Sequence, residues 1–223
     1  MTNAPRGRTG NLLPTARTTL RRKADRGRYD WESVAGILDA GMIAHVGFTA
    51  PAGVCVLPMA YARVDGHLYL HGAAGNAMLR GLATGTDVCV TVTLVDALVL
   101  SRSAFHHSMN YRSVVVVGRA TTVDDPDEKA DALRAIVDHT VPGRSGACRG
   151  PSASELRATR VVFLPISEAS AKVRTGPPIE EPEDLDLPYW GGEVPVLTAF
   201  GTPVADEFVV TGVQAPTVHD TSV

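Results

Sequence analysis

A run of four valines, Val114 to Val117, constrains the fold of this chain more than any other feature. Branched side chains pack well on a pleated surface, so the run favours a buried β-strand. Directly before it comes a group of hydrogen-bonding side chains: His106, His107, Asn110, Tyr111, Arg112 and Ser113. Such a group at the start of a rigid strand can hold a ligand with atoms that do not move. The alternative is that these histidines are ordinary core or interface residues.

Similar strand patterns recur along the chain with few helices between them. Helices are expected over 30–41, with Asp30 as N-cap and Gly41 at the end, over 75–82, and from Pro126 after the N-cap Asp125. The expected strands are 42–49, 54–63, 67–71, 87–94, 97–101, 112–123 and 160–167, with 112–123 the longest. Six or seven short strands at close spacing predict a small β-barrel, so the expected fold class is mainly β with peripheral helices.

Composition limits the class of protein and its partners. The 223 residues are 44% hydrophobic with a net charge of −3, which is typical of a soluble globular protein and gives no reason to expect a nucleic-acid partner. No apolar stretch is long enough to predict a membrane span. The three cysteines show neither CxxC pairing nor metal-ligand spacing, so we expect free thiols in a reducing cytoplasm and no metal site.

Charge and proline content divide the chain into three parts. Residues 1–29 form an Arg-rich arm, which we expect to fold over a partner subunit or to cap an anionic ligand. Residues 30–175 contain the strand patterns of the barrel. Residues 176–223 are rich in proline and acid, so we expect them to wrap the surface and to build no second core.

Four motifs in this order of elements resemble the flavin split-barrel superfamily typified by pyridoxamine 5'-phosphate oxidase, and within it a branch related to the nitroimidazole-resistance reductases. The motifs are HVGF (45–48), LYLHGAA (68–74), residues 103–118, and ASAKVRTGPP (169–178) followed by PYWG (188–191). The resemblance implies a split β-barrel of the FMN-binding type, with six or more antiparallel strands. It also implies a homodimer with FMN in a groove between the two barrels.

The resemblance further implies which residues contact the flavin. The expected contacts are Pro58, Met59, His71, Gly72, Ala73, Asn76, Arg80, Arg112, Ser113, Lys172, Arg174 and Trp190. Relatives carry a serine and a basic residue where this chain has Asn76 and Ala77, so Arg80, Lys172, Arg174 or the basic arm would have to hold the phosphate. Pro58 donates no backbone N–H and marks an edge or interrupted strand. Arg112 is alternatively a partner in a structural ion pair.

His71 is the candidate catalytic residue, because the reductases carry a histidine beside the flavin at this position. The pKa of an unperturbed histidine lies near neutrality, so His71 could give a proton to a substrate that is reduced by hydride. The alternative is a structural hydrogen bond from His71 to the flavin or to a turn carbonyl. Histidines 71, 106 and 107 could also supply an axial ligand to a haem iron.

The resemblance therefore predicts an FMN-dependent oxidoreductase that passes hydride from a reduced nicotinamide to a small electrophile, such as a nitro-aromatic or a quinone. The basic contacts that a pyridoxamine phosphate oxidase makes with its substrate phosphate cannot be placed on this chain. Two alternatives stay open. One is a flavin- or haem-binding protein for storage, sensing or regulation; the other is a deazaflavin-dependent reductase.

Overall fold

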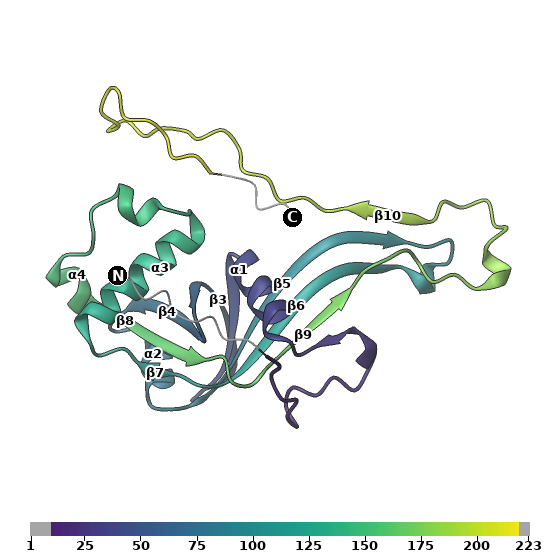
Figure 1. Ribbon diagram of the computed structural model, residues 1–223, viewed down its shortest axis with the longest axis horizontal. Helices are drawn as coiled ribbons and strands as arrows, with labels where there is room; N and C mark the ends of the chain where they lie inside the picture. Colours follow the sequence, from purple (N-terminus) through teal and green to yellow (C-terminus); the bar gives the residue numbers. More distant parts are fainter. Residues whose placement is uncertain (1–9, 219–223) are drawn as a thin grey trace.

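Ten antiparallel strands form one sheet in the computed structural model, which describes residues 10–218 (Figure 1). Hydrogen-bonded neighbours follow the order β1-β9-β6-β5-β2-β3-β4-β8-β7, and β10 pairs with β5. The strands are β1 (Gly27–Arg28), β2 (Ile43–Ala50), β3 (Gly53–Val64), β4 (His67–Ala73), β5 (Asp87–Leu100), β6 (Ser108–Arg119), β7 (Thr121–Thr122), β8 (Thr159–Pro165), β9 (Ala169–Arg174) and β10 (Gly192–Pro195). The helices are α1 (Trp31–Ala40), α2 (Ala77–Ala83), α3 (Pro126–Thr140) and α4 (Ala153–Ala158), with short 3-10 helices η1 (Ala24–Arg26), η2 (Ala104–His106), η3 (Arg144–Ala147) and η4 (Pro182–Asp184). The predicted mainly β fold class with peripheral helices is confirmed.

Several strands differ from their expected bounds. Residues 87–100 form one continuous strand, β5, because a β-bulge between Val95 and Ala97 absorbs the break that we expected there. With 14 residues β5 is the longest strand, so the prediction for 112–123 was wrong. The valine run lies in β6, which already begins at Ser108. Strands β9 and β10 were not among the expected ones.

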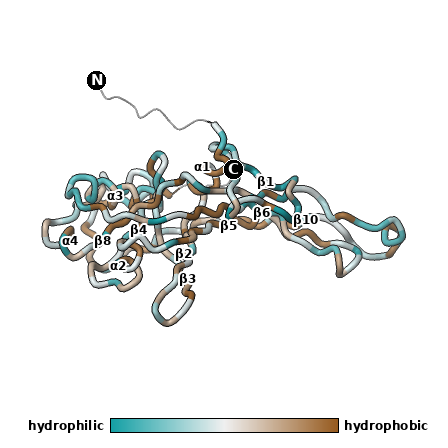
Figure 2. The backbone as a smooth tube through the Cα atoms, turned by 90° about the horizontal axis from the view of Figure 1, so that it is seen from below, coloured by the Kyte–Doolittle hydropathy of each residue, from teal (hydrophilic) through white to brown (hydrophobic). Residues whose placement is uncertain are grey.

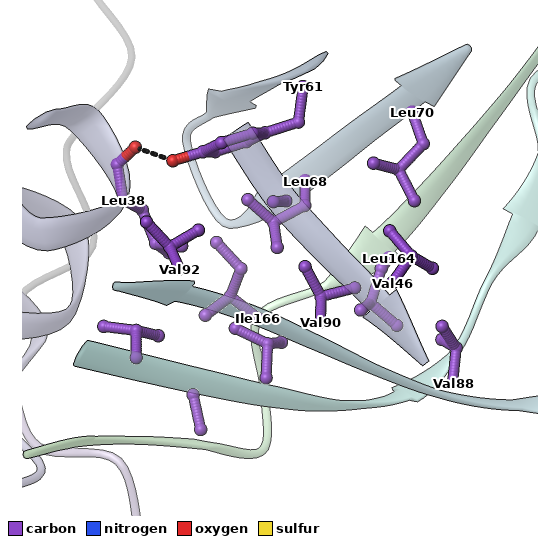
Figure 3. Close-up of a cluster of buried hydrophobic side chains, with 14 of the residues drawn as sticks. Leu38, Val46, Tyr61, Leu68, Leu70, Val88, Val90, Val92, Leu164 and Ile166 are labelled. Carbon is purple, nitrogen blue, oxygen red and sulfur yellow. Dashed lines mark hydrogen bonds between the residues drawn. The ribbon is translucent and has the colours of Figure 1, made fainter. Parts of the chain in front are cut away.

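The core lies between the strands, α1 and α2, and Figure 3 shows part of it. In β6, Val114 and Val116 are fully buried while Val115 between them is half-buried, as the alternation of a strand requires. Tyr61 is the largest fully buried side chain. Its hydroxyl donates to the carbonyl of Leu38 and lies 2.9 Å from that of Gly41, which ties β3 to the end of α1.

Gly41 is needed for close packing and not for an unusual backbone conformation. Its φ of −85° lies outside the left-handed region expected of a glycine that ends a helix. A Cβ at this position would lie 2.3 Å from Cγ1 of Val92. At its other end α1 begins as predicted, because the Asp30 side chain accepts a hydrogen bond from the backbone N–H of Ser33 at 2.8 Å.

Helix α3 packs against β3, β4 and β8. Asp125 caps it by accepting hydrogen bonds from the N–H groups of Asp127 and Glu128, and Pro126 occupies its first turn as predicted. The Tyr69 hydroxyl on β4 donates to Glu128 Oε1 at 3.1 Å. A small apolar cluster lies beneath the helix and contains Val123, Ala132 and Val161, with Tyr69, Leu133 and Phe163 against it. These contacts fix α3 over β4.

The two ends of the described chain behave differently. Residues 10–29 pack on their own barrel: Leu12 is buried, β1 pairs with β9, and Arg17 contacts Glu168. Residues 1–9 of the predicted arm lie outside the described chain. The C-terminal segment adds β10 to the edge of β5 and then runs back along the length of the molecule (Figure 1). Between residues 10 and 218, no helix has the length and apolar character needed to cross a bilayer.

Candidate functional site

The expected flavin contacts do not meet in one pocket of the single chain. His71, Asn76, Arg112 and Arg174 each line a different hollow. One group of expected contacts lies on β4 and α2, another on β6 and β9, and three strands lie between β4 and β6 in the sheet.

His71 faces a hollow of about 310 Å³ between β4 and α3, which we call the His71 hollow. Its lining residues are His71, Leu133, Arg134, Ile136, Val137, Ser145, Cys148, Arg149, Gly150, Pro151 and Glu155. The apolar wall comes from one side of α3, and Val137 on it is exposed. The size is that of a small-molecule site.

The Nδ1 atom of His71 is buried and has no hydrogen-bond partner within residues 10–218. Buried polar atoms are almost always hydrogen-bonded, so this atom calls for an explanation such as a ligand. Burial also lowers the pKa of His71, because it disfavours the charged imidazolium. At neutral pH the side chain is therefore a neutral imidazole, which is the form that binds transition metals.

The loop after α3 borders the His71 hollow and is held by several hydrogen bonds. Ser145 donates from both its N–H and its hydroxyl to Asp138 on α3, at 2.7 and 2.6 Å. Arg149 makes two hydrogen bonds to Glu155, and this pairing is the main reason that the pKa of Glu155 falls to about 2. Ser152 and Glu155 form a capping box at the start of α4. The loop thus holds Arg149 beside the hollow.

The opposite face of β4 leads to a second hollow. Gly72 points toward α2, since a Cβ on it would lie 2.9 Å from Cδ1 of Leu79. Asn76 caps α2 by accepting from the N–H of Leu79 at 3.1 Å. The second hollow measures about 380 Å³ and is lined by Phe48, Thr49, Ala50, Pro51, Leu57, Asn76, Ala77, Met78, Gly81, Leu82 and Thr86. Neither Arg80 nor any other cation is part of this lining.

A third hollow, of about 450 Å³, lies along the edge of β5 between β2 and β10. Arg112 lies in it and is paired with Asp96, with Nη2 2.8 Å from Oδ1. The hydrogen bond from Asp96 raises the pKa of Arg112. The ion pair that we considered as the alternative role of Arg112 is therefore present. Ser113, the residue after Arg112, has its Oγ 3.4 Å from the carbonyl oxygen of Lys172.

Arg174 and Trp190 serve their own chain in this structure. The buried guanidinium of Arg174 donates to Asn110 Oδ1 and to the carbonyls of Gly176 and Pro177, at 3.0 and 3.2 Å to the carbonyls. Trp190 is 62% exposed, and its ring lies against Gly192.

Two further candidates from the sequence, His106 and His107, lie at the turn of the β5–β6 hairpin and not in an extended strand. His106 lies 3.4 Å from Glu181, and His107 Nδ1 lies 3.0 Å from the carbonyl of Ser103. Neither lines the His71 hollow. Of the three histidines considered as haem ligands, His71 is the one that lines this hollow.

Pro58 and Met59 lie on β3 where that strand has one neighbour. Residues 53–60 pair with β2, and pairing with β4 begins only at Tyr61. Within the described chain the other edge of residues 53–60 carries no ladder, as the proline predicted. An antiparallel barrel interrupted at one strand defines a flavin split-barrel protein.

The chain belongs to the pyridoxamine 5'-phosphate oxidase family, whose model matches residues 30–173. Among solved structures it is similar to the flavocytochrome Anf3 from Azotobacter vinelandii, with 38% identity and a TM-score of 0.86 over 92% of this chain and 95% of that one. It is also similar to the FAD and heme binding protein from Mycobacterium smegmatis, with 32% identity and a TM-score of 0.81 over 86% and 94% of the two chains. A comparison with curated proteins found no match.

A third similar structure, a putative 5-nitroimidazole antibiotic resistance protein from Bacteroides thetaiotaomicron, shares the fold at 24% identity and a TM-score of 0.57, over 66% of this chain and 86% of that one. A match to 92% of this chain cannot leave out the whole segment after residue 173, where the family match ends. Part of the C-terminal segment is therefore common to this chain and the flavocytochrome.

The residues around His71 include several that the sequence did not point to as a site. Arg134, Cys148 and Arg149 come from α3 and the loop after it. The available signal is the apolar stripe of α3, which includes the half-buried Leu133, the buried Ile136 and Val137. Such a stripe predicts a face buried in the core, and only the exposure of Val137 shows that part of it lines a hollow.

Proposed function

We propose that this chain is a redox protein that binds both a haem and a flavin, with His71 as an axial ligand of the haem. The single observation that carries this proposal is that His71, whose buried Nδ1 has no partner within residues 10–218, lines a hollow with an apolar wall. The similarity to a flavocytochrome and to an FAD and heme binding protein, both above 30% identity, supports it.

The residues of the His71 hollow suit a haem in three respects. A neutral imidazole supplies the ligand atom. The side chains of Leu133, Ile136 and Val137 offer an apolar surface for a flat ring. Arg134 and Arg149 line the same hollow and can pair with anionic carboxylates on the ring, although each already contacts an acidic side chain of its own chain.

A bound haem supplies one-electron transfer, and a bound flavin accepts hydride and passes electrons on. The protein contributes position and environment. Burial keeps His71 unprotonated, so that no proton has to leave before a metal binds. Helix α3 and the loop held by Asp138 and Arg149 exclude water from one side of the hollow.

For the flavin we propose a groove that a second copy of the chain completes. This proposal requires the homodimer that the sequence predicts. Within one chain the expected contacts on β4 and α2 lie apart from those on β6 and β9. In the proposed dimer the β4 and α2 contacts of one copy face the β6 and β9 contacts of the other. The β2–β3 hairpin extends away from the body and exposes Val54, Val56 and Leu57, which suits a partner surface (Figure 2). FMN remains our prediction for the flavin, with FAD or a deazaflavin as alternatives.

The reaction remains a prediction: hydride from a reduced nicotinamide would pass through the flavin to a small electrophile, such as a nitro-aromatic or a quinone, in the cytoplasm. The lowered pKa of His71 bears on its part in this reaction. A histidine that is neutral at pH 7 is a poor proton donor there and a good metal ligand. The ligand role is therefore favoured over the catalytic role expected from the sequence.

Titration of purified protein with haem tests the proposal. Wild-type protein should bind haem with a shifted Soret band, and His71→Ala should lose at least about tenfold in affinity, because the axial bond is gone. His67→Ala is the matched control, since His67 lies on the same strand but outside the hollow, and it should bind as wild type. Equal haem affinity and an identical Soret band in wild type and His71→Ala would rule out the ligand role.

A further inference from the structure

We infer that residues 197–218, the C-terminal arm, pack on a second copy of this chain and clasp it. The inference rests on the proposed homodimer and adds the segment that holds the two copies together. It concerns a part of the chain that lies outside the family match, which ends at residue 173.

The first two residues of the arm, Leu197 and Thr198, still line the third hollow of their own barrel. Up to Val196 the segment is tied down: β10 pairs with β5, Asn110 contacts Glu193, and the N–H of Val196 donates to the carbonyl of Asp96 at 3.0 Å. Two hydrogen bonds further on join arm residues to each other, from the N–H of Phe208 to Asp206 and from the N–H of Val213 to the carbonyl of Val210. In Figure 1 this part of the arm runs back past α1 toward the side of α3.

The arm carries large apolar side chains that are exposed to solvent in the single chain. Leu197 and Phe208 are each 79% exposed, and Val204 is 94% exposed. An extended segment without helix or sheet gains nothing from such side chains unless another surface covers them. The β2–β3 hairpin, with its exposed Val54 and Val56, offers an uncovered apolar surface on the second copy.

Charge complementarity also favours a second copy as the partner. The arm contains no lysine or arginine, and its two charged side chains, Asp206 and Glu207, are both acidic. The stretch 10–28 has the opposite character: Arg17, Arg21, Arg22, Lys23, Arg26 and Arg28 stand against Asp25 alone. A second copy therefore presents both an apolar and a basic surface to an apolar arm whose two charged side chains are acidic.

Photo-cross-linking from the arm tests this inference. The full chain is made with p-benzoyl-phenylalanine in place of Phe208 and irradiated after purification. Packing on a second copy should give a product of twice the chain mass of 23.5 kDa, with the cross-linked peptide located in residues 10–28 or 53–57. The matched control carries the probe at Val64, at the end of β3 and outside the arm, and should give less of this product. Cross-links only within one chain, or none, would overturn the inference.

The oligomeric state separates failure of the arm from failure of the dimer. The variant Leu197→Ser, Val204→Ser, Phe208→Ser and a chain ending at Pro195 should both raise the dissociation constant of the dimer by at least about tenfold in sedimentation, with unchanged circular dichroism. If both variants dimerise as tightly as wild type, the arm is not part of the interface, although the protein is still a dimer. If the wild type itself has a mass of 23.5 kDa at every concentration, both proposals fail.

Discussion

At the scale of the residue, His71 combines burial, an unpaired ring nitrogen and a position in an apolar hollow. Each property has a physical consequence that can be measured without a cofactor. Burial disfavours the imidazolium, so the folded chain binds a proton at His71 less readily than the unfolded chain does.

This difference predicts how stability changes with pH. Between the lowered pKa of His71 in the folded chain and its ordinary value of 6.5, the unfolded state binds more protons, so stability is complete above about pH 6.5 and falls as the pH drops through this window. The cofactor-free protein should therefore lose more stability than His71→Gln between pH 7 and pH 5. Urea unfolding of both at several pH values measures this. Parallel curves would show that His71 titrates alike in the folded and unfolded chains.

At the scale of the element, the His71 hollow depends on how α3 is anchored. The Asp125 side chain accepts from the N–H groups of Asp127 and Glu128, at 3.0 and 2.8 Å. Asp125→Ala removes this cap and should lower the free energy of unfolding by about 1 kcal/mol. Asp124→Ala is the control, because Asp124 lies outside the helix and should change stability by less than half as much. Urea unfolding with equal losses in the two variants would contradict the assigned cap.

The sequence predicts those elements whose signals are local. The caps Asp30 and Asp125 and the valine run of β6 each act within a few residues of the chain, and the structure has them where they were expected. The break expected near residue 95 is absent, because pairing with β6 continues through a bulge that only the partner strand can impose. Strand β10 was missed for the same reason: its four residues are a strand only because the edge of β5 is beside them.

The candidate site was less predictable than the elements. His71 was singled out by its motif, but what surrounds it comes from α3 and the loop after it, far along the chain. For Arg112 the sequence suggested an ion pair but not its partner. The partner, Asp96, lies at a β-bulge whose geometry no sequence pattern reveals. Residues that meet only through long-range folding cannot be paired from sequence spacing.

At the scale of the whole molecule, two parts project from the barrel: the β2–β3 hairpin and the C-terminal arm (Figures 1 and 2). Both expose large apolar side chains. Two copies and two cofactors would account for this surface and for the separation of the expected flavin contacts. The single chain contributes the His71 hollow by itself, whereas the flavin groove needs the partner in our proposal.

The cofactor content of the purified protein tests this account most directly. The protein is isolated from cells supplied with a haem precursor, and its absorption spectrum is compared with the haem and flavin released from a known amount of chain. We predict a Soret band together with flavin bands, and about one haem and one flavin per chain. A protein that carries flavin alone, and that takes up no haem when haem is added, would contradict the assignment of His71 on which the account depends.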